Sequence, residues 1–221
     1  MKKPFLFLLF FLLQVTILPA QKITMATSAE ASGFSTERLQ RIDKAMNEWV
    51  QKEWMNGGVA LVIRNGKMVY YKAAGYNDLA AKKPLQKESI FRIASQTKAI
   101  TSVAVMMLFE EGKLLLDDPV SKYIPSFKKQ TVLEKFTAED TTYTTVPAKR
   151  DITIRDLLTH TSGIGYAQIG SKEANAIYAK NNVTSGIGVT NSTLFDAMDR
   201  LGKLPLMHQP GEKFTYGLNS D

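Results

Sequence analysis

The chain has 221 residues, of which 44% are apolar, so it can build a sizeable core as one ordinary domain or as part of a larger one. It contains no cysteine, which excludes disulfides, thiol chemistry and a lipid-modified cysteine. The formal charge of +7 comes from scattered basic residues without a long basic stripe, which argues against a nucleic-acid partner.

The N-terminal segment has the pattern of a secretory signal peptide. Lys2 and Lys3 precede an apolar run that ends near a small residue, Ala20. A membrane anchor is the alternative, although the run is short for a spanning helix. We therefore expect residues 1–20 to be removed and residues 21–33 to form a leader. The protein would then be exported, periplasmic or secreted, without a stable membrane anchor.

An amphipathic helix and a β-hairpin are expected next. Apolar residues recur at helical spacing through residues 35–50, and Ser35 is a natural N-cap. Residues 59–73 hold two β-rich runs on either side of Asn65-Gly66, which is a strong hairpin signal. A helix and a hairpin without βαβ alternation favour an α+β fold over a doubly wound sheet.

The stretch from Ala99 to Glu111 is apolar almost all round. This composition predicts a helix that is buried on most of its sides. Gly112 supplies the signal for its C-terminal end.

The remaining segments are more polar. Residues 128–150 are Thr-rich and are expected to be a surface excursion, and residues 170–192 are expected to be mobile. A short helix is predicted through Leu157, and a last helix is predicted with Asn191 or Ser192 as its cap.

The stretch FRIASQTKAI places Ser95 three residues before Lys98, at the start of the apolar helix. Residues three apart share a helix face, so the hydroxyl and the amine become neighbours. The helix dipole and burial both oppose protonation, so we expect the pKa of Lys98 to be lowered and its amine to take the serine proton. The local pattern also fits a capping serine with a lysine whose charged end reaches solvent. A second Ser-x-x-Lys pattern, Ser126 to Lys129, lies in a polar stretch and is expected to be a solvated loop.

Three segments carry a resemblance to a known family: FRIASQTKAITSVAVMMLFEEGKLLLDDPVSKYIP, ITIRDLLTHTSGI and PGEKFTYG. In this order they resemble the serine β-lactamase and penicillin-binding-protein-like family, most of all its class C β-lactamase and esterase branch. The resemblance implies an α+β fold with an antiparallel sheet flanked by helices, plus a mostly helical subdomain. It places the family's S-x-x-K arrangement on Ser95 and Lys98. It also places the family's tyrosine on Tyr216, which would hydrogen-bond to the Ser95 oxygen and share acid–base work with Lys98.

Two departures from the family pattern matter. In β-lactamases of this branch, asparagine follows the tyrosine by two positions, whereas here Leu218 stands there and Asn219 comes one position later. That spacing is more similar to esterase and amidohydrolase members, and Asn219 is the candidate substrate-binding residue. The family's third motif, Lys or His, a small residue and Gly, has no match before Asp221. We therefore expect residues 34–221 to be an incomplete domain, truncated before the C-terminal strands and helix, and unstable and inactive alone.

The resemblance implies an exported serine hydrolase that acts on ester or amide bonds through an acyl-enzyme on Ser95. A carboxylesterase, a β-lactamase and a D-amino-acid peptidase stay open. The substrate would be a small-molecule ester, amide or β-lactam, or a cell-wall peptide, with no cofactor and no metal. The alternatives are a non-catalytic member of the same fold that binds cell-wall peptide or a partner protein, and a fragment without a function of its own.

The two histidines are given no catalytic role. The resemblance makes His160, in HTSG, part of a turn that supports the site, although a Ser-His-Asp triad is an alternative. His208 is expected to be exposed, and two histidines without a cysteine make a zinc site improbable.

Overall fold

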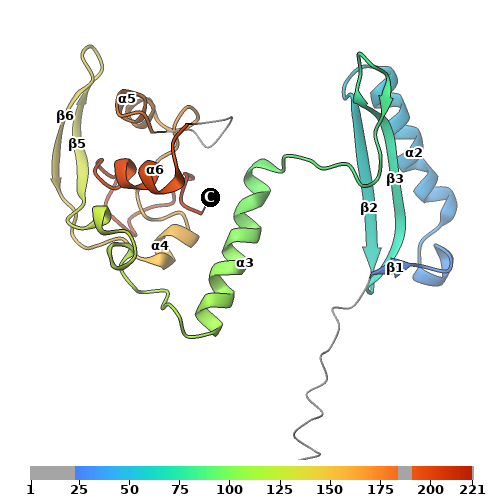
Figure 1. Ribbon diagram of the computed structural model, residues 1–221, viewed down its shortest axis with the longest axis horizontal. Helices are drawn as coiled ribbons and strands as arrows, with labels where there is room; N and C mark the ends of the chain where they lie inside the picture. Colours follow the sequence, from blue (N-terminus) through green and yellow to red (C-terminus); the bar gives the residue numbers. More distant parts are fainter. Residues whose placement is uncertain (1–22, 184–190, 221) are drawn as a thin grey trace, which may run out of the picture. The chain divides into compact units, whose positions relative to one another are not determined.

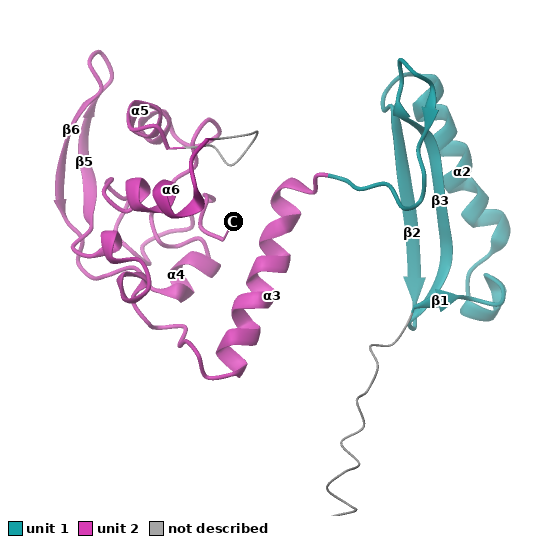
Figure 2. Cartoon of the chain, in the orientation of Figure 1, with its two compact units in different colours: residues 1–91 teal, residues 92–221 magenta. Residues whose placement is uncertain are grey.

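The computed structural model describes residues 23–183 and 191–220. The chain forms two compact units, the first ending at Phe91 and the second beginning at Arg92 (Figure 2). The predicted signal peptide lies outside the described residues. In the described part of the chain, every helix is too short or too polar to cross a membrane.

The first unit is a small sheet with a long helix against one face (Figure 1). Its elements are β1 (Thr24–Met25), a 3₁₀ helix (Glu30–Ser32), α2 (Thr36–Gln51), β2 (Gly57–Arg64), β3 (Lys67–Asp78) and β4 (Lys83–Pro84). β3 is central: β2 and β4 pair with it in antiparallel fashion, and β1 pairs with it in parallel. The sheet is thus antiparallel except at one short edge strand.

The expected helix and hairpin of this unit are confirmed. The side chain of Ser35 caps α2 by accepting a hydrogen bond from the Arg38 amide at 3.3 Å. Asn65 and Gly66 both have positive φ, 49° and 70°. A two-residue turn of this kind requires that backbone, because it matches the right-handed twist of the flanking strands.

The helix is tied to the sheet by a polar contact. The carboxylate of Asp43 on α2 accepts hydrogen bonds from the Tyr70 hydroxyl and the Lys72 amine of β3, each at 2.7 Å. Tyr70 is buried, and this burial, together with the hydrogen bond that its hydroxyl donates to Asp43, raises the pKa of that hydroxyl to about 12.

The second unit is mostly helical and has one added hairpin (Figure 1). Its elements are 3₁₀ helices at Ala94–Gln96, Val120–Lys122 and Pro125–Phe127, with α3 (Thr97–Glu110), β5 (Thr131–Thr137), β6 (Thr142–Pro147), α4 (Ile154–Leu158), α5 (Lys172–Lys180) and α6 (Leu194–Leu201). Its core gathers around Ile152, Ile177 and Leu206, which are almost completely enclosed.

The polar segments of this unit are more ordered than expected. Residues 128–150 contain the β5–β6 hairpin, and Val132 of β5 reaches the core. Residues 170–192 were expected to be mobile, but their described part contains α5, which buries Ala174, Ile177 and Tyr178. Residues 184–190 lie outside the described part.

Two helices also differ from expectation in detail. The cap of α6 is Thr193 rather than Asn191 or Ser192, because its side chain accepts a hydrogen bond from the Asp196 amide at 3.1 Å. α3 has nearly the predicted bounds, but the expectation that it is buried on most sides is not met. Of its 14 residues only Lys98 is buried.

Candidate active site

Ser95 and Lys98 lie at the point where α3 begins. Ser95 is exposed on the 3₁₀ turn Ala94–Gln96, and Lys98 is the second residue of the helix. Ala94, directly before the serine, has a φ of 44°. A residue with a Cβ rarely adopts this left-handed backbone, so the turn that carries Ser95 is strained.

The structure brings Lys98 and Tyr216 together. The Lys98 Nζ lies 5.0 Å from the centroid of the Tyr216 ring and 5.7 Å from that of Tyr166. The two tyrosine rings are nearly parallel, with an angle of 10° and centroids 6.0 Å apart. The amine of the buried Lys98 thus lies over the faces of two aromatic rings. From the sequence, Tyr166 was only a candidate to line a substrate cleft, because its position in a Gly-bearing segment carries no signal of this contact.

His160 packs on the same tyrosine. Its ring centroid is 4.9 Å from that of Tyr216 and 5.6 Å from that of Phe214, which it meets edge-on. The backbone of His160, at a φ of 56°, accepts a hydrogen bond from the Thr215 amide at 2.8 Å. The turn at His160 therefore contacts the Tyr216 segment through both its ring and its backbone.

Asn219 is buried, and its amide group is engaged at both ends. Its Nδ2 lies 3.0 Å from His160 Nδ1, and its Oδ1 accepts a hydrogen bond from the Ser162 hydroxyl. Ser162 Oγ in turn accepts a hydrogen bond from the Ile164 amide at 3.0 Å. The substrate-binding role of Asn219 stays a prediction.

The turn that carries His160 is anchored by a buried carboxylate. Asp156 accepts hydrogen bonds from Arg150 at 2.6 and 2.9 Å, from Thr153, and from the Thr161 hydroxyl at 3.1 Å. Burial raises the pKa of Asp156, but the hydrogen bonds from Arg150 and Thr153 outweigh it and leave the pKa below its ordinary value. Asp156 is therefore expected to stay ionised at neutral pH.

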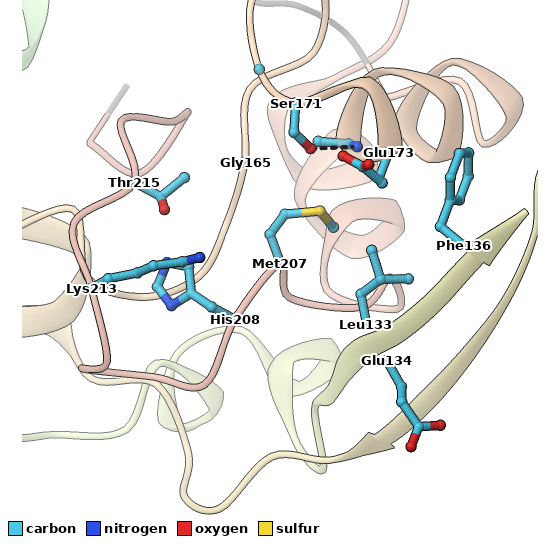
Figure 3. Close-up of a pocket in the computed structure, with 12 residues that line it drawn as sticks. Leu133, Glu134, Phe136, Gly165, Ser171, Glu173, Met207, His208, Lys213 and Thr215 are labelled. Carbon is cyan, nitrogen blue, oxygen red and sulfur yellow. Dashed lines mark hydrogen bonds between the residues drawn. The ribbon is translucent and has the colours of Figure 1, made fainter. Parts of the chain in front are cut away.

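A cavity of about 450 Å³ in the second unit is lined by residues of β5, of α5 and of the segment from Met207 to Thr215 (Figure 3). Gly165 and Thr215, which line it, each directly precede one of the stacked tyrosines. Its lining also includes His208, which is buried, so the expectation that His208 is exposed is wrong. The His208 ring is fixed by a contact of 2.9 Å between Nδ1 and the Gln209 carbonyl oxygen.

The second Ser-x-x-Lys pattern does not lie at the start of a helix with a buried lysine. Ser126 lies on the short 3₁₀ turn Pro125–Phe127, and Lys129 is exposed beyond that turn. Elsewhere too, residues 23–183 and 191–220 contain no group of three or more His, Cys, Asp or Glu side chains that could hold a metal ion.

A sequence model of the family described as Beta-lactamase matches residues 41–219 of the chain. Esterase EstB of Burkholderia gladioli is 32% identical over 199 residues, which are 89% of this chain and 47% of that protein. The structure of EstCE1, titled a hydrolase with promiscuous acyltransferase activity, aligns with a TM-score of 0.68 at 28% identity and covers 86% of this chain and 45% of that one. Simvastatin synthase (LovD) from Aspergillus terreus aligns with a TM-score of 0.64 at 25% identity, covering 84% and 45%. The chain spans less than half the length of each.

Proposed function

Since the chain belongs to the serine β-lactamase and penicillin-binding-protein-like family and has its α+β fold, we propose that the protein is an exported serine hydrolase that cleaves ester or amide bonds through an acyl-enzyme on Ser95. The observation that carries the proposal is the buried Lys98 amine, which lies 5.0 Å from the Tyr216 ring centroid and one helical turn after Ser95. A buried lysine at a helix start has a structural cost, so a chemical role is a reason for its presence.

The proposed reaction divides the proton transfers between two groups. The Ser95 oxygen forms a bond to the substrate carbonyl carbon, and the hydroxyl proton passes to the neutral amine of Lys98. Tyr216 delivers a proton to the leaving alcohol or amine as its bond to the acyl carbon breaks, and Lys98 returns a proton to Tyr216. Water then attacks the acyl-serine, and the acid leaves with Ser95 regenerated.

The start of α3 supports this assignment electrostatically. The helix has 14 residues, so its first turn presents free N–H groups and the positive end of its dipole beside Ser95. We propose that the Ser95 amide is one donor to the oxyanion that forms on the substrate. The left-handed backbone of Ala94 fits this role, because strain of this kind is retained at functional turns.

An ester is the preferred substrate class within this proposal. Leu218 stands where β-lactamases of this branch have asparagine, and the amide of Asn219 is taken up by His160 and Ser162. A β-lactam or peptide amide would therefore find no free asparagine at this point. The similarity to a protein named an esterase agrees with this preference.

Covalent labelling of the protein that carries this chain tests the proposal. A fluorophosphonate probe is expected to add its mass at Ser95 and to add none in Ser95→Ala. Ser126→Ala, which alters the other Ser-x-x-Lys pattern, is the matched control and should label like the wild type. Folded protein that gains no label, or Ser95→Ala that labels normally, would overturn the proposal.

Turnover separates the roles and the substrate classes. Lys98→Ala and Tyr216→Phe are each expected to lower hydrolysis of p-nitrophenyl esters by about 10²–10⁴-fold, because each removes a proton-transfer group. Hydrolysis of p-nitrophenyl esters should exceed that of nitrocefin. The opposite ratio would sink the ester preference and leave the serine hydrolase standing.

A further inference from the structure

The orientation of Tyr216 needs a physical cause. The residue lies on a segment without helix or strand, and its side chain is only partly covered, with 39% of the residue exposed. An acid–base group works only if its oxygen is held close to its productive position. Two rings flank it: Tyr166, stacked at 6.0 Å between centroids, and His160 at 4.9 Å.

The hydrogen bonds behind His160 have a fixed direction. The Ile164 amide donates to Ser162 Oγ, and the Ser162 hydroxyl donates its own hydrogen to Asn219 Oδ1. The Asn219 NH₂ group faces His160, and an NH₂ group can only donate, so His160 Nδ1 is the acceptor in this arrangement. This arrangement assigns a tautomer to the imidazole, with Nδ1 unprotonated and the proton on Nε2.

The same network packs against the backbone next to Tyr216. A Cβ built at Gly217 would come within 2.7 Å of the Asn219 Nδ2 and 2.7 Å of the Gly165 carbonyl oxygen. The chain directly after the tyrosine thus fits closely around the Asn219 amide, and no larger residue fits without a shift.

We propose that His160 and Asn219 form a positioning pair for Tyr216: Asn219 fixes the tautomer and the plane of the His160 ring, and that ring fixes the plane of Tyr216. The inference rests on the proposed acid–base role of Tyr216. His160 acts here through Tyr216, not as a member of a triad. In this pair, Asn219 orients Tyr216 indirectly, through the His160 ring.

Nitrogen NMR of the protein labelled with ¹⁵N-histidine tests the assigned tautomer without any activity. The chain has two histidines, and the structure assigns them opposite tautomers. His160 should carry its proton on Nε2, whereas His208 should carry it on Nδ1, because that atom faces a carbonyl oxygen. A His160 that is protonated on Nδ1 at neutral pH would overturn the pair.

Variants test the effect on Tyr216. Asn219→Leu removes the donor and is expected to lower kcat for a p-nitrophenyl ester by about 10–100-fold, with KM changed less than about twofold, because Tyr216 is displaced and binding is not. Asn219→Asp replaces the donor by an acceptor, so the His160 signals should show a proton on Nδ1. His160→Asn keeps an acceptor for Asn219 and tolerates the positive φ, but it loses the ring, so it should show the same kcat loss.

Asn175→Leu is the matched control. Its amide is also partly buried and hydrogen-bonded, to the carbonyls of Gln168 and Gly170, so it should cost stability and leave kcat unchanged. If Tyr216→Phe leaves kcat unchanged, the proposed function fails. If Tyr216→Phe lowers kcat while Asn219→Leu and His160→Asn do not, the proposed function stands and the positioning pair is wrong.

Discussion

A single carboxylate, that of Asp156, fixes the two ends of the segment that leads to the site. It accepts hydrogen bonds from Arg150 at one end and from Thr161 at the other, and it closes a capping box with Thr153 at the start of α4. Thr161 directly follows His160, so this interaction also sets where the His160 turn begins. A buried carboxylate with several donors is costly to disturb, because the donors would be left unpaired.

Replacing this carboxylate should lower stability far more than replacing an exposed carboxylate that bridges to the same helix. Asp156→Asn is expected to lower the free energy of unfolding by about 2–3 kcal/mol, since it breaks the bridge to Arg150 at a nearly buried site. Asp117→Asn breaks the exposed bridge to Arg155 and should cost far less, because solvent screens that pair. Urea unfolding at pH 7 measures both, and equal losses would contradict the assigned role of Asp156.

The effect of Asp156 should also depend on pH. Because its hydrogen bonds from Arg150 and Thr153 outweigh burial, its pKa in the folded state lies below the ordinary value of 3.8. A carboxyl with a lowered pKa contributes stability that is present above the unfolded pKa and is lost as pH falls through the folded pKa. The stability difference between wild type and Asp156→Asn should therefore be largest near neutral pH and shrink below about pH 4. A difference that stays constant down to pH 3 would show that Asp156 does not titrate in this way.

At the scale of elements, the sequence predicted what is local. The cap at Ser35, the turn at Asn65-Gly66 and the start of α3 near Ser95 each depend on residues a few positions apart. α5 was missed because its buried face, which includes Ile177, is short and set in a polar segment.

In the candidate site too, local features could be predicted from the sequence and contacts between distant segments could not. Ser95 and Lys98 could be paired from their spacing, whereas Tyr216 was identified by family resemblance. Its contacts with Tyr166 and His160 depend on packing between distant segments, and no local pattern encodes such packing.

α3 is an apolar helix with exposed side chains. Matched substitutions on α3 and on a buried helix can test this exposure. Ile100 on α3 is 61% exposed, whereas Ile177 on α5 is fully buried. Ile100→Ala is therefore expected to cost less than about 1 kcal/mol of unfolding free energy, and Ile177→Ala about 2–5 kcal/mol. Similar losses for the two variants in urea unfolding would mean that the α3 face is covered in solution.

At the scale of the whole molecule, the apolar core is unevenly divided. In the second unit a continuous cluster of buried residues extends from Val120 to Leu206. In the described part of the first unit, the buried apolar side chains are those of Met46, Tyr70 and Leu85. Hydrophobic burial is the main favourable term in folding, so the first unit has much less of it to offset its conformational entropy.

Hydrogen exchange should reveal this imbalance. Amides of the β2–β3 hairpin are expected to exchange through local opening well before amides of α5 and of the segment at Leu206. Met46→Ala should speed exchange in the first unit and leave the second unchanged, and Leu206→Ala should do the reverse, because Met46 is buried in the first unit and Leu206 belongs to the core cluster of the second. Mass spectrometry of peptic peptides measures exchange separately in the two units. If either variant accelerated both units equally, the chain would unfold as one cooperative body and the division of the core would carry no energetic meaning.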